Sequence, residues 1–392
     1  MTSHGCLSAL TTPLNFRPVL SSNKPGPEKL KIKNKPGIKL QRKKNKTAKI
    51  RIGIIGAGEM ASRLHIPWIK AARNAEIAAL CRRDAAKAFS LAIKHGIRAV
   101  YTDYRDLLSE KSIDAVIIAT PNSLHCVQAA AAARAGKHIF IEKPMALSVA
   151  ELETIIREAE KCRVILMAGH PLRFDRGIIK VKQAVDSGII GRVLSMRGRL
   201  GHAGPEKWSA AAKWYFDSKQ GGGCLPDLGI HIFDAMRFVS RKDASSVYCL
   251  TKTNMKKALV DDNAAAVVEF TDGTSGSFDV SWTAVPQELS LSVYGDKGSI
   301  FFNAGTREVK VELVNAKTGK FRLIKPRIPA AGRSDNPLAH FIECVRENKR
   351  PLIDGREAFN STALIIAALQ SAETGRRQAV HGLRKKRKAC SR

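Results

Sequence analysis

Asp227 and His231 stand four residues apart in the stretch Asp-Leu-Gly-Ile-His, and both side chains can carry or release a proton. If this stretch begins a helix, the two side chains project from the same face and can act on one ligand. Three glycines at 221–223 would let the preceding backbone approach that ligand closely. A titratable group within reach of a substrate hydroxyl can serve as its base or acid. The alternatives are a helix cap at Asp227 and a satisfied, buried imidazole at His231.

Lys143 is a further candidate because of its place in the sequence. It follows the apolar run 138–141 in the sequence Glu142-Lys143-Pro144, where we expect a buried strand to end. A merely solvated lysine is unusual at that position, whereas an ammonium group there would stabilise an alkoxide developing on a substrate oxygen. Residues 120–125 follow another predicted strand. Because the ligands of open parallel sheets bind at the carboxyl ends of the strands, we expect both segments at one site.

The segment Gly-Ala-Gly-Glu-Met-Ala at 56–61 follows the apolar run 50–55, and it should open a helix. In such a Gly-x-Gly-x-x-Ala pattern, Gly56 permits the tight turn and Gly58 lets the backbone approach a pyrophosphate. Ala61 lets the helix pack closely on the strand. Unpaired N–H groups at the start of the helix then face the phosphate charge. The pattern predicts a dinucleotide site, and a plain structural turn is the alternative.

Strand and helix patterns alternate after residue 50, which predicts a doubly wound parallel sheet. Strands are expected at 50–55, 76–81, 99–101, 114–120, 138–141 and 164–168, and helices at 84–95, 103–110, 122–135 and 148–161. Short alternating runs then predict a largely antiparallel sheet. Its expected strands are 247–253, 264–270, 274–282, 288–294, 299–302 and 309–314, followed by helices at 337–348 and 356–374, the second of which should return to the first domain.

This pattern predicts four parts of the 392-residue chain: a disordered basic extension at 1–49, a dinucleotide-binding domain at 50–170, a substrate and oligomerisation domain at 171–380, and a basic tail at 381–392. Much of the net charge of +31 lies at the ends, since residues 1–49 hold twelve Lys or Arg and one acid. We expect these ends to be solvated, with nucleic acid or anionic lipid as the alternative partners. A nucleic-acid site would need interleaved aromatic residues, and Phe16 is the single aromatic in the two tails.

No apolar run approaches the length of a membrane span. The eight cysteines are scattered and form no Cys-x-x-Cys pair, which favours reduced thiols over disulfides, and no metal site is indicated. We therefore expect a cytoplasmic protein. The Ser/Thr-rich, acid-free residues 1–23 faintly resemble a transit peptide, so an organelle is the alternative.

The fingerprint, the strand-end Glu-Lys-Pro and a later Gly-Gly-Gly-x-x-x-Asp-x-Gly-x-His together resemble the Gfo/Idh/MocA oxidoreductase family. The likeness covers about residues 50–380 in order and spacing. It implies a Rossmann domain followed by an α/β domain with an open sheet that often forms dimers or tetramers. It also implies hydride transfer between NAD or NADP and a carbon of a sugar, a sugar derivative or a cyclitol.

The resemblance further implies roles for individual residues. His231 would transfer the proton, Asp227 would bind substrate or orient that group, and Lys143 would polarise the reacting oxygen. Arg173, in an Arg-Phe pair, would flank the active site and contact substrate, although the preceding His170-Pro171 departs from the expected residues. The predicted cofactor-binding residues are Gly56, Gly58, Met60, Ala61, Arg82, Arg83, Thr120, Asn122, His125, Glu142 and Lys143.

The end of the second strand, Cys81-Arg82-Arg83-Asp84, bears on the choice of dinucleotide. A carboxylate there would bind the ribose 2′-OH of NAD, whereas a guanidinium offers a charge-assisted fork to the 2′-phosphate of NADP. Arg82 stands where NAD-preferring relatives commonly have Asp, and Asp84 is better placed to cap the next helix. We therefore expect NADP to be favoured, with NAD as the alternative.

Other functions stay open at this point. A glycosidase or lyase on this fold could oxidise its sugar transiently and retain its cofactor, and a non-catalytic NAD(P)-binding regulator should lack one of Lys143, Asp227 and His231. Within residues 201–220, loop packing and substrate contact are equal expectations for four side chains, namely Lys207, Trp208, Lys213 and Trp214.

Overall fold

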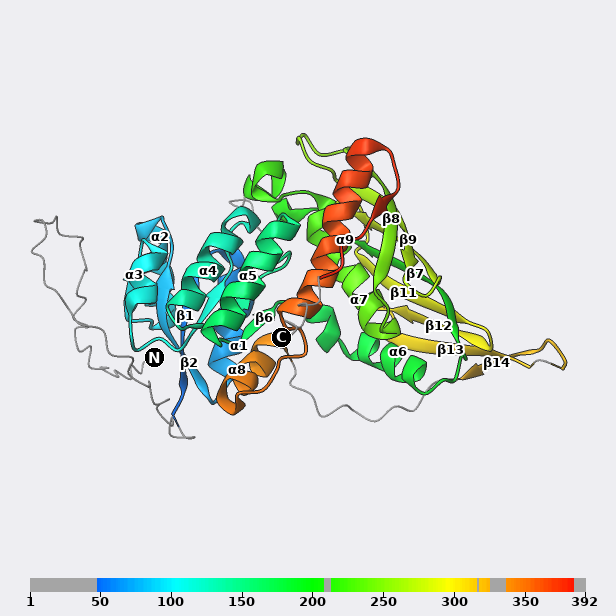
Figure 1. The fold of residues 1–392 in the computed structure, drawn as a ribbon, viewed down its shortest axis with the longest axis horizontal. Coiled ribbons are helices and arrows are strands. Elements are labelled where there is room, and N and C mark those ends of the chain that lie inside the picture. The colour runs from blue at the N-terminus through cyan, green and yellow to red at the C-terminus, as the bar shows by residue number, and fades with distance from the viewer. Residues whose placement is uncertain (1–47, 208–212, 316, 325–335, 384–392) are drawn as a thin grey trace, which may run out of the picture. The chain divides into compact units, whose positions relative to one another are not determined.

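The computed structural model describes residues 48–207, 213–315, 317–324 and 336–383. The predictions for residues 1–47, for Trp208 and for the tail beyond residue 383 lie outside these residues. The described chain builds two sheets with helices packed on them (Figure 1).

The first sheet has six parallel strands in the order β3-β2-β1-β4-β5-β6. The strands are β1 (Ile50–Ile55), β2 (Ala75–Cys81), β3 (Ala99–Tyr101), β4 (Ala115–Ile118), β5 (His138–Ile141) and β6 (Leu166–Ala168). This is the strand order of a dinucleotide-binding fold, with the switch point between β1 and β4. The predicted doubly wound parallel sheet is therefore confirmed.

The described residues of this half form five α-helices, namely α1 (Ile66–Ala71), α2 (Ala85–His95), α3 (Tyr104–Ser109), α4 (His125–Arg134) and α5 (Val149–Cys162). Three of the five begin where the sequence places their caps, whereas α4 begins three residues later than expected. Asp84 and Asp103 accept hydrogen bonds from the first-turn N–H groups of α2 and α3, and Ser148 with Glu151 forms the predicted capping box of α5. The helix expected directly after the fingerprint differs, because it opens as a π-helical turn over Ala61–His65 before α1 begins.

The second sheet has nine strands in the order β14-β13-β12-β11-β7-β10-β9-β8-β15, all antiparallel except the β7–β10 pair. The strands are β7 (Val193–Gly201), β8 (Ala244–Lys252), β9 (Asn263–Phe270), β10 (Ser275–Ser281), β11 (Glu288–Gly295), β12 (Gly298–Asn303), β13 (Glu308–Val314), β14 (Phe321–Ile324) and β15 (Gln378–Ala379). The predicted open, largely antiparallel sheet is confirmed. Three of its strands, β7, β14 and β15, were not predicted. The central strand β7 escaped prediction because glycine interrupts its apolar alternation. A Cβ on Gly198 would lie 2.4 Å from Cγ1 of Ile232.

The described residues form four further α-helices: α6 (Arg176–Asp186), α7 (Ile230–Ser240), α8 (Pro337–Glu347) and α9 (Gly355–Thr374). Phe341 of α8 and Phe359 in the first half of α9 belong to the core of the parallel sheet. Leu364 and Ile365, in the middle of α9, belong to the core of the second sheet. The helix expected to return to the first domain therefore spans both cores, and it runs between the two sheets in Figure 1.

Candidate active site

Two adjoining cavities open at the carboxyl ends of the parallel strands. The first is a cleft of about 890 Å³, and Gly56, Gly58 and Arg82 form part of its wall. The second has a volume of about 640 Å³ and is lined by Lys143, Asp227 and His231 among others. Five residues line both spaces, namely Met60, Ala119, Thr120, Trp214 and Tyr215. The cleft therefore leads directly to the ionisable side chains.

The shape of the cleft fits a dinucleotide. Gly56 has a φ of +88°, and a Cβ there would lie 2.5–2.6 Å from backbone atoms of Ala119 and Thr120. At Gly58 the nearest atom to an added Cβ is the Gly56 carbonyl oxygen, at 3.9 Å, so a side chain would take space that a ligand could use. Arg82 Nη1 donates to the Ala57 carbonyl oxygen at 3.0 Å, which holds the guanidinium at the wall of the cleft.

The predicted cofactor residues divide into lining and supporting positions. Nine of the eleven line one or both spaces, and they are Gly56, Gly58, Met60, Arg82, Arg83, Thr120, Asn122, Glu142 and Lys143. Ala61 and His125 are fully buried behind them. The His125 ring lies between the carbonyl oxygens of Pro144, 3.0 Å from Nδ1, and Thr120, 3.1 Å from Nε2. His125 therefore links two strand-end loops instead of facing a ligand.

Lys143 and Asp227 form a direct ion pair at the wall of the second cavity. Lys143 follows β5, while Asp227 lies in a π-helical turn over Leu225–Gly229 that leads into α7. Lys143 Nζ donates to Asp227 Oδ1 at 2.7 Å and to the Asp227 carbonyl oxygen at 2.7 Å. Trp282, just after β10, donates its indole N–H to Asp227 Oδ2 at 3.1 Å. The pair is thus oriented from both halves of the molecule.

The glycine-rich turn before Asp227 allows this close approach. A Cβ on Gly222 would lie 2.3 Å from the Tyr215 carbonyl oxygen, and one on Gly223 would lie 2.5 Å from Asp261 Oδ1. Asp261 accepts a hydrogen bond from the Leu225 N–H at 2.7 Å, at the beginning of the helical run that carries Asp227. Asp261 thereby acts as a helix cap supplied from a distant loop.

His231 lies in the first turn of α7 and lines the same cavity. Burial, followed by the charge of Lys143, holds the pKa of its imidazole well below the usual value. Its Nδ1 atom is buried and has no hydrogen-bond partner within the described parts of the chain. The ring is therefore neutral at neutral pH, which is the state that can accept a proton.

Two further histidines at this site were not predicted. His202, which follows β7, lines the cavity with Nε2 3.9 Å from Asp227 Oδ2. Its Nδ1 accepts a hydrogen bond from the Gly204 N–H at 3.0 Å, so the neutral ring carries its proton on Nε2. His65, at the end of the first π-helical turn, is fully buried with Nε2 2.8 Å from Glu142 Oε1. A strand end and the end of the fingerprint helix were the signals that could have indicated them.

Glu142 belongs to the buried support of Lys143. Its Oε2 accepts a hydrogen bond from the Lys143 backbone N–H at 3.2 Å, while Oε1 is held by His65. Burial by itself raises the pKa of the Glu142 carboxyl, but the His65 hydrogen bond and the charges of His65 and Lys143 outweigh it, and the pKa is lowered. An ionised Glu142 thus fixes the backbone from which the lysine projects.

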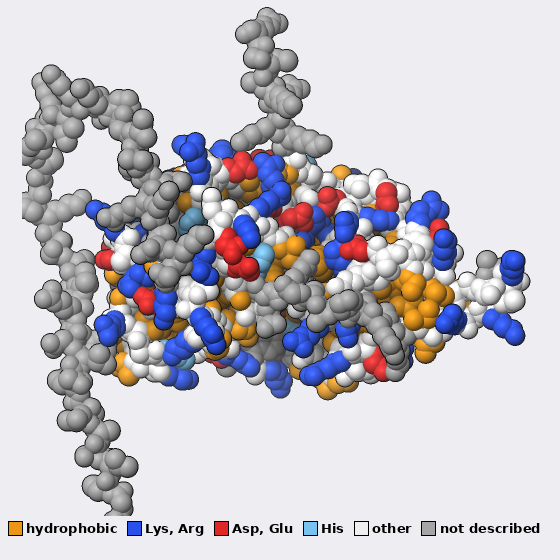
Figure 2. Space-filling model, turned by 90° about the horizontal axis from the view of Figure 1, so that it is seen from below, with side chains coloured by type: hydrophobic (Ala, Val, Ile, Leu, Met, Phe, Trp, Pro, Cys, Tyr) orange, Lys and Arg blue, Asp and Glu red, His pale blue; other side chains and the backbone are white. Residues whose placement is uncertain are grey.

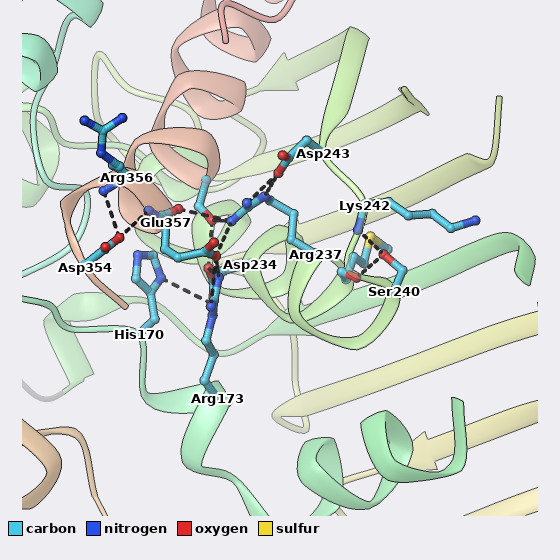
Figure 3. Close-up of polar contacts among 12 residues, drawn as sticks. His170, Arg173, Asp234, Arg237, Ser240, Lys242, Asp243, Asp354, Arg356 and Glu357 are labelled. Carbon is cyan, nitrogen blue, oxygen red and sulfur yellow. Dashed lines mark hydrogen bonds and ion pairs between the residues drawn. The ribbon is translucent and has the colours of Figure 1, made fainter. Parts of the chain in front are cut away.

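The sequence predicts that Arg173 contacts substrate, whereas in the structure its side chain bonds to other side chains and lies outside the linings of the two cavities. Its guanidinium is 3% exposed, is absent from the lining of the two cavities and forms a two-pronged ion pair with Asp234, with both N–O distances 2.8 Å (Figure 3). Glu357 accepts two more of its hydrogen bonds, each at 3.2 Å. His170 is buried beside this cluster with Nδ1 3.7 Å from Asp234 Oδ2, and burial lowers the pKa of the His170 ring to about 4. Arg173 therefore anchors α7 and α9.

In the segment before the glycines, Trp214 lines both cavities and stacks on Tyr215 with ring centroids 4.0 Å apart. Lys207 and Lys213 are exposed and do not line the two cavities that the described residues form. Of the three described side chains in this group, Trp214 is the one placed to contact a ligand.

Comparison with known proteins identifies the family. Residues 50–170 match the family model described as an oxidoreductase family with an NAD-binding Rossmann fold, and residues 178–301 match the Gfo/Idh/MocA C-terminal domain. The chain belongs to the Gfo/Idh/MocA oxidoreductases. It is thus a member of a family of NAD(P)-dependent dehydrogenases and reductases.

Individual relatives align over most of their length. The chain is 31% identical over 297 residues to scyllo-inositol 2-dehydrogenase (NAD(+)) of Bacillus subtilis, covering 74% of this chain and 84% of that protein. It is 29% identical over 340 residues to myo-inositol 2-dehydrogenase of Thermotoga maritima, covering 83% and 97%. The crystal structure of a probable dehydrogenase from Thermotoga maritima superposes with a TM-score of 0.70 at 27% identity, covering 84% and 98%. None of the helices in the described parts combines the length and apolar character that membrane crossing requires.

Proposed function

We propose that the protein transfers a hydride between a nicotinamide cofactor and a hydroxyl-bearing carbon of a sugar, sugar derivative or cyclitol. The observation that carries the proposal is the convergence of Lys143, Asp227 and His231 on one cavity that adjoins the dinucleotide cleft. The inositol dehydrogenases among the relatives support a polyhydroxylated substrate.

The side chains divide the work as follows. The nicotinamide, when bound, accepts or donates the hydride. In the oxidising direction neutral His231 takes the hydroxyl proton, because its low pKa keeps the ring unprotonated. The Lys143 ammonium stabilises the developing alkoxide, and Asp227 fixes the position of that ammonium. His202, which lines the cavity and carries its proton on Nε2, would contact a substrate hydroxyl.

The preferred cofactor in this proposal is NADP. Arg82 and Arg83 line the cleft beyond the end of β2, where the adenosine ribose of a dinucleotide binds in this fold. Of the carboxylates that line the cleft, Asp84 directly follows these arginines, and it caps α2 by accepting a hydrogen bond from the Lys87 N–H at 3.1 Å. A guanidinium at the wall and a capped carboxylate support recognition of a 2′-phosphate.

The proposal extends to a cytoplasmic homo-oligomer, a dimer or tetramer, formed through the open face of the second sheet. Tyr248 and Val267 are cross-strand neighbours on β8 and β9 and are 40% and 60% exposed. Figure 2 shows hydrophobic side chains exposed among Lys and Arg over the half of the molecule that holds this sheet. Val267→Glu should therefore shift sedimentation toward a smaller species, whereas an unchanged sedimentation coefficient would contradict this interface.

A cofactor screen tests the activity. Purified protein is mixed with NADP⁺ or NAD⁺ and a panel of cyclitols, aldoses and glycosides, and the reduced-nicotinamide absorbance is followed. We expect net reduction with at least one panel member and none with Lys143→Met. Product formation without net reduction would instead identify a cofactor-retaining glycosidase or lyase, and binding without turnover would identify a regulator.

A further inference from the structure

The wall of the second cavity is divided in chemical character. The ionisable side chains come from the strand-end loops, from β7 and from the helical run around α7, as described above. Much of the remaining wall is apolar, and it is contributed by Leu64, Trp68, Leu172, Leu289, Ala304 and Pro337. Leu289 and Ala304 lie together, because the Ala304 N–H donates to the Leu289 carbonyl oxygen at 2.9 Å.

This apolar wall fits a free sugar or cyclitol poorly. Each hydroxyl group of such a molecule needs a hydrogen-bond partner, since burying one without a partner costs roughly 1–3 kcal/mol. Leu64 and Trp68, at the first π-helical turn and α1, offer only carbon atoms and a single indole N–H to a ligand. A substrate that covers this wall beside the nicotinamide would therefore carry an apolar part against it.

The charges in the cavity further restrict the ligand. Among the described residues that line it, Lys143 is the single Lys or Arg, and its ammonium is already paired with Asp227. His202 and His231 add no positive charge at neutral pH, because burial lowers the pKa of both rings. Among these described lining residues, a phosphate or carboxylate on the substrate would find no further Lys or Arg to pair with. The described wall therefore favours an uncharged ligand.

We infer that the substrate is a neutral sugar bearing an apolar substituent, of the class of alkyl or aryl glycosides. The inference rests on the proposed function and narrows its substrate class. The carbinol that reacts lies beside Lys143 and His231, and the substituent packs on the wall formed by Trp68 and Leu172. Oxidation of one ring hydroxyl leaves the glycosidic bond intact, and the hydride and proton leave to the nicotinamide and His231.

A homologous series of substrates tests this inference on the holoprotein. Glucose and its methyl, butyl, hexyl and phenyl glycosides are compared by kcat/KM, together with glucose 6-phosphate as the charged member. Each added methylene should raise kcat/KM about fourfold until the wall is covered. Equal use of glucose and the hexyl glycoside, or a preference for the phosphorylated sugar, would overturn the inference.

Two variants test whether the apolar wall causes the dependence of kcat/KM on substituent length. Leu172→Ser should reduce the hexyl-to-methyl ratio of kcat/KM about tenfold, because it places a hydroxyl in the apolar wall. Val127→Ser, an exposed position on α4 outside both cavities, is the matched control and should keep the wild-type ratio. An unchanged ratio in Leu172→Ser would place the substituent elsewhere and contradict the proposal.

Binding separates this inference from the proposed activity. Dissociation constants for the same glycosides are measured through intrinsic tryptophan fluorescence of the cofactor-loaded protein, since Trp68 and Trp214 line the cavity. Affinity that rises with chain length in the absence of any turnover would sustain the apolar substituent and refute the oxidoreductase activity. Turnover without chain-length dependence would support the oxidoreductase activity and refute the apolar substituent.

Discussion

Two ion pairs, Lys143–Asp227 and Arg173–Asp234, connect the parallel sheet to the π-helical turn and helix α7. The two pairs have different roles. Asp227 and Asp234 are seven residues apart in this segment, and they pair with Lys143 after β5 and Arg173 after β6. The side chains of the first pair are 10% and 11% exposed and line the cavity, whereas those of the second are 3% and 1% exposed and line neither cavity. Similar chemistry therefore forms a site in one place and a structural anchor in the other.

The difference lies in the cation as well as in burial. The planar guanidinium of Arg173 donates hydrogen bonds to both carboxylate oxygens of Asp234 and to Glu357. These N–H groups are therefore used in bonds within the protein. The Lys143 ammonium is a compact charge on a flexible stem, and it can turn toward a substrate oxygen. We therefore propose the Lys143–Asp227 pair as the reacting centre, whereas the Arg173–Asp234 pair belongs to the scaffold.

The largest effect should come from removing the proton acceptor at the Lys143–Asp227 pair. His231→Ala should lower turnover roughly 10²- to 10⁴-fold, because a general base contributes that much, while cofactor affinity stays nearly intact. Steady-state rates and a fluorescence titration with the reduced cofactor measure the two quantities. Wild-type turnover in this variant would remove His231 from the proposed chemistry.

The Arg173–Asp234 pair should affect stability instead. Asp234→Asn leaves a buried guanidinium partly unpaired and should lower the free energy of unfolding by about 3–5 kcal/mol in urea titrations. Asp227→Asn is the matched control, with a smaller loss because its partner faces the cavity. Equal losses in the two variants would contradict the distinction between the pairs.

The stabilisation from Asp234 should also depend on pH in a definite direction. Although burial raises the pKa of its carboxyl, Arg173 and the other nearby positive groups lower it below the ordinary value of 3.8. A depressed folded-state pKa gives stability that is present above the unfolded pKa and lost as the pH falls below it. Wild-type stability should therefore decline below about pH 4, and Asp234→Asn should flatten that decline.

Arg82 is intermediate between the bonded Arg173 and the cavity-lining Lys143. Its Nη1 donates a hydrogen bond to the Ala57 carbonyl oxygen, and its side chain still lines the cleft. Arg82→Asp should shift the ratio of kcat/KM for NADPH over NADH about 10- to 100-fold toward NADH, the value of a charge-assisted hydrogen bond. Arg98→Asp, an exposed arginine outside the cleft, is the control and should leave the ratio unchanged. Wild type that favours NADH would refute recognition of the phosphate.

The smallest effect is expected from the charges at the start of the chain. Removing residues 1–49 should change neither the melting temperature nor turnover appreciably, because the sequence there contains little apolar area to bury. Differential scanning calorimetry and the cofactor assay measure both. A large drop in either would show that the extension contributes to the folded enzyme.

Local signals explain how much of the fold could be predicted. The parallel strands follow from short apolar runs, and the helix starts follow from the capping residues Asp84 and Ser148. The predicted starts of these two helices agree with the structure to within about two residues. Strand β7 depends on a tertiary contact, since Gly198 leaves room for Ile232, and a single sequence does not show that contact. The fold was predictable where its cause was local.

The same limit applies to the site. The structure brings Lys143, Asp227 and His231 to one cavity, and their catalytic roles stay predictions. Arg173 could not be assigned from sequence because its partners, Asp234 and Glu357, are 61 and 184 residues away. His65 and His202 were missed because their positions, at the end of the fingerprint helix and after the unpredicted strand β7, indicate a role only once Glu142 or Asp227 is placed beside them.

The most direct test of the account is single-turnover hydride transfer in two variants at a temperature where both are folded. Lys143→Met and Asp234→Asn are each loaded with the oxidised cofactor and mixed with a substrate found in the screen, and the reduced-nicotinamide absorbance is recorded per folded molecule. We predict that Asp234→Asn reduces its cofactor within about tenfold of the wild-type rate, while Lys143→Met is slower by about 10² or more. Comparable rates in Lys143→Met and wild type would contradict the claim that chemistry occurs at the accessible pair.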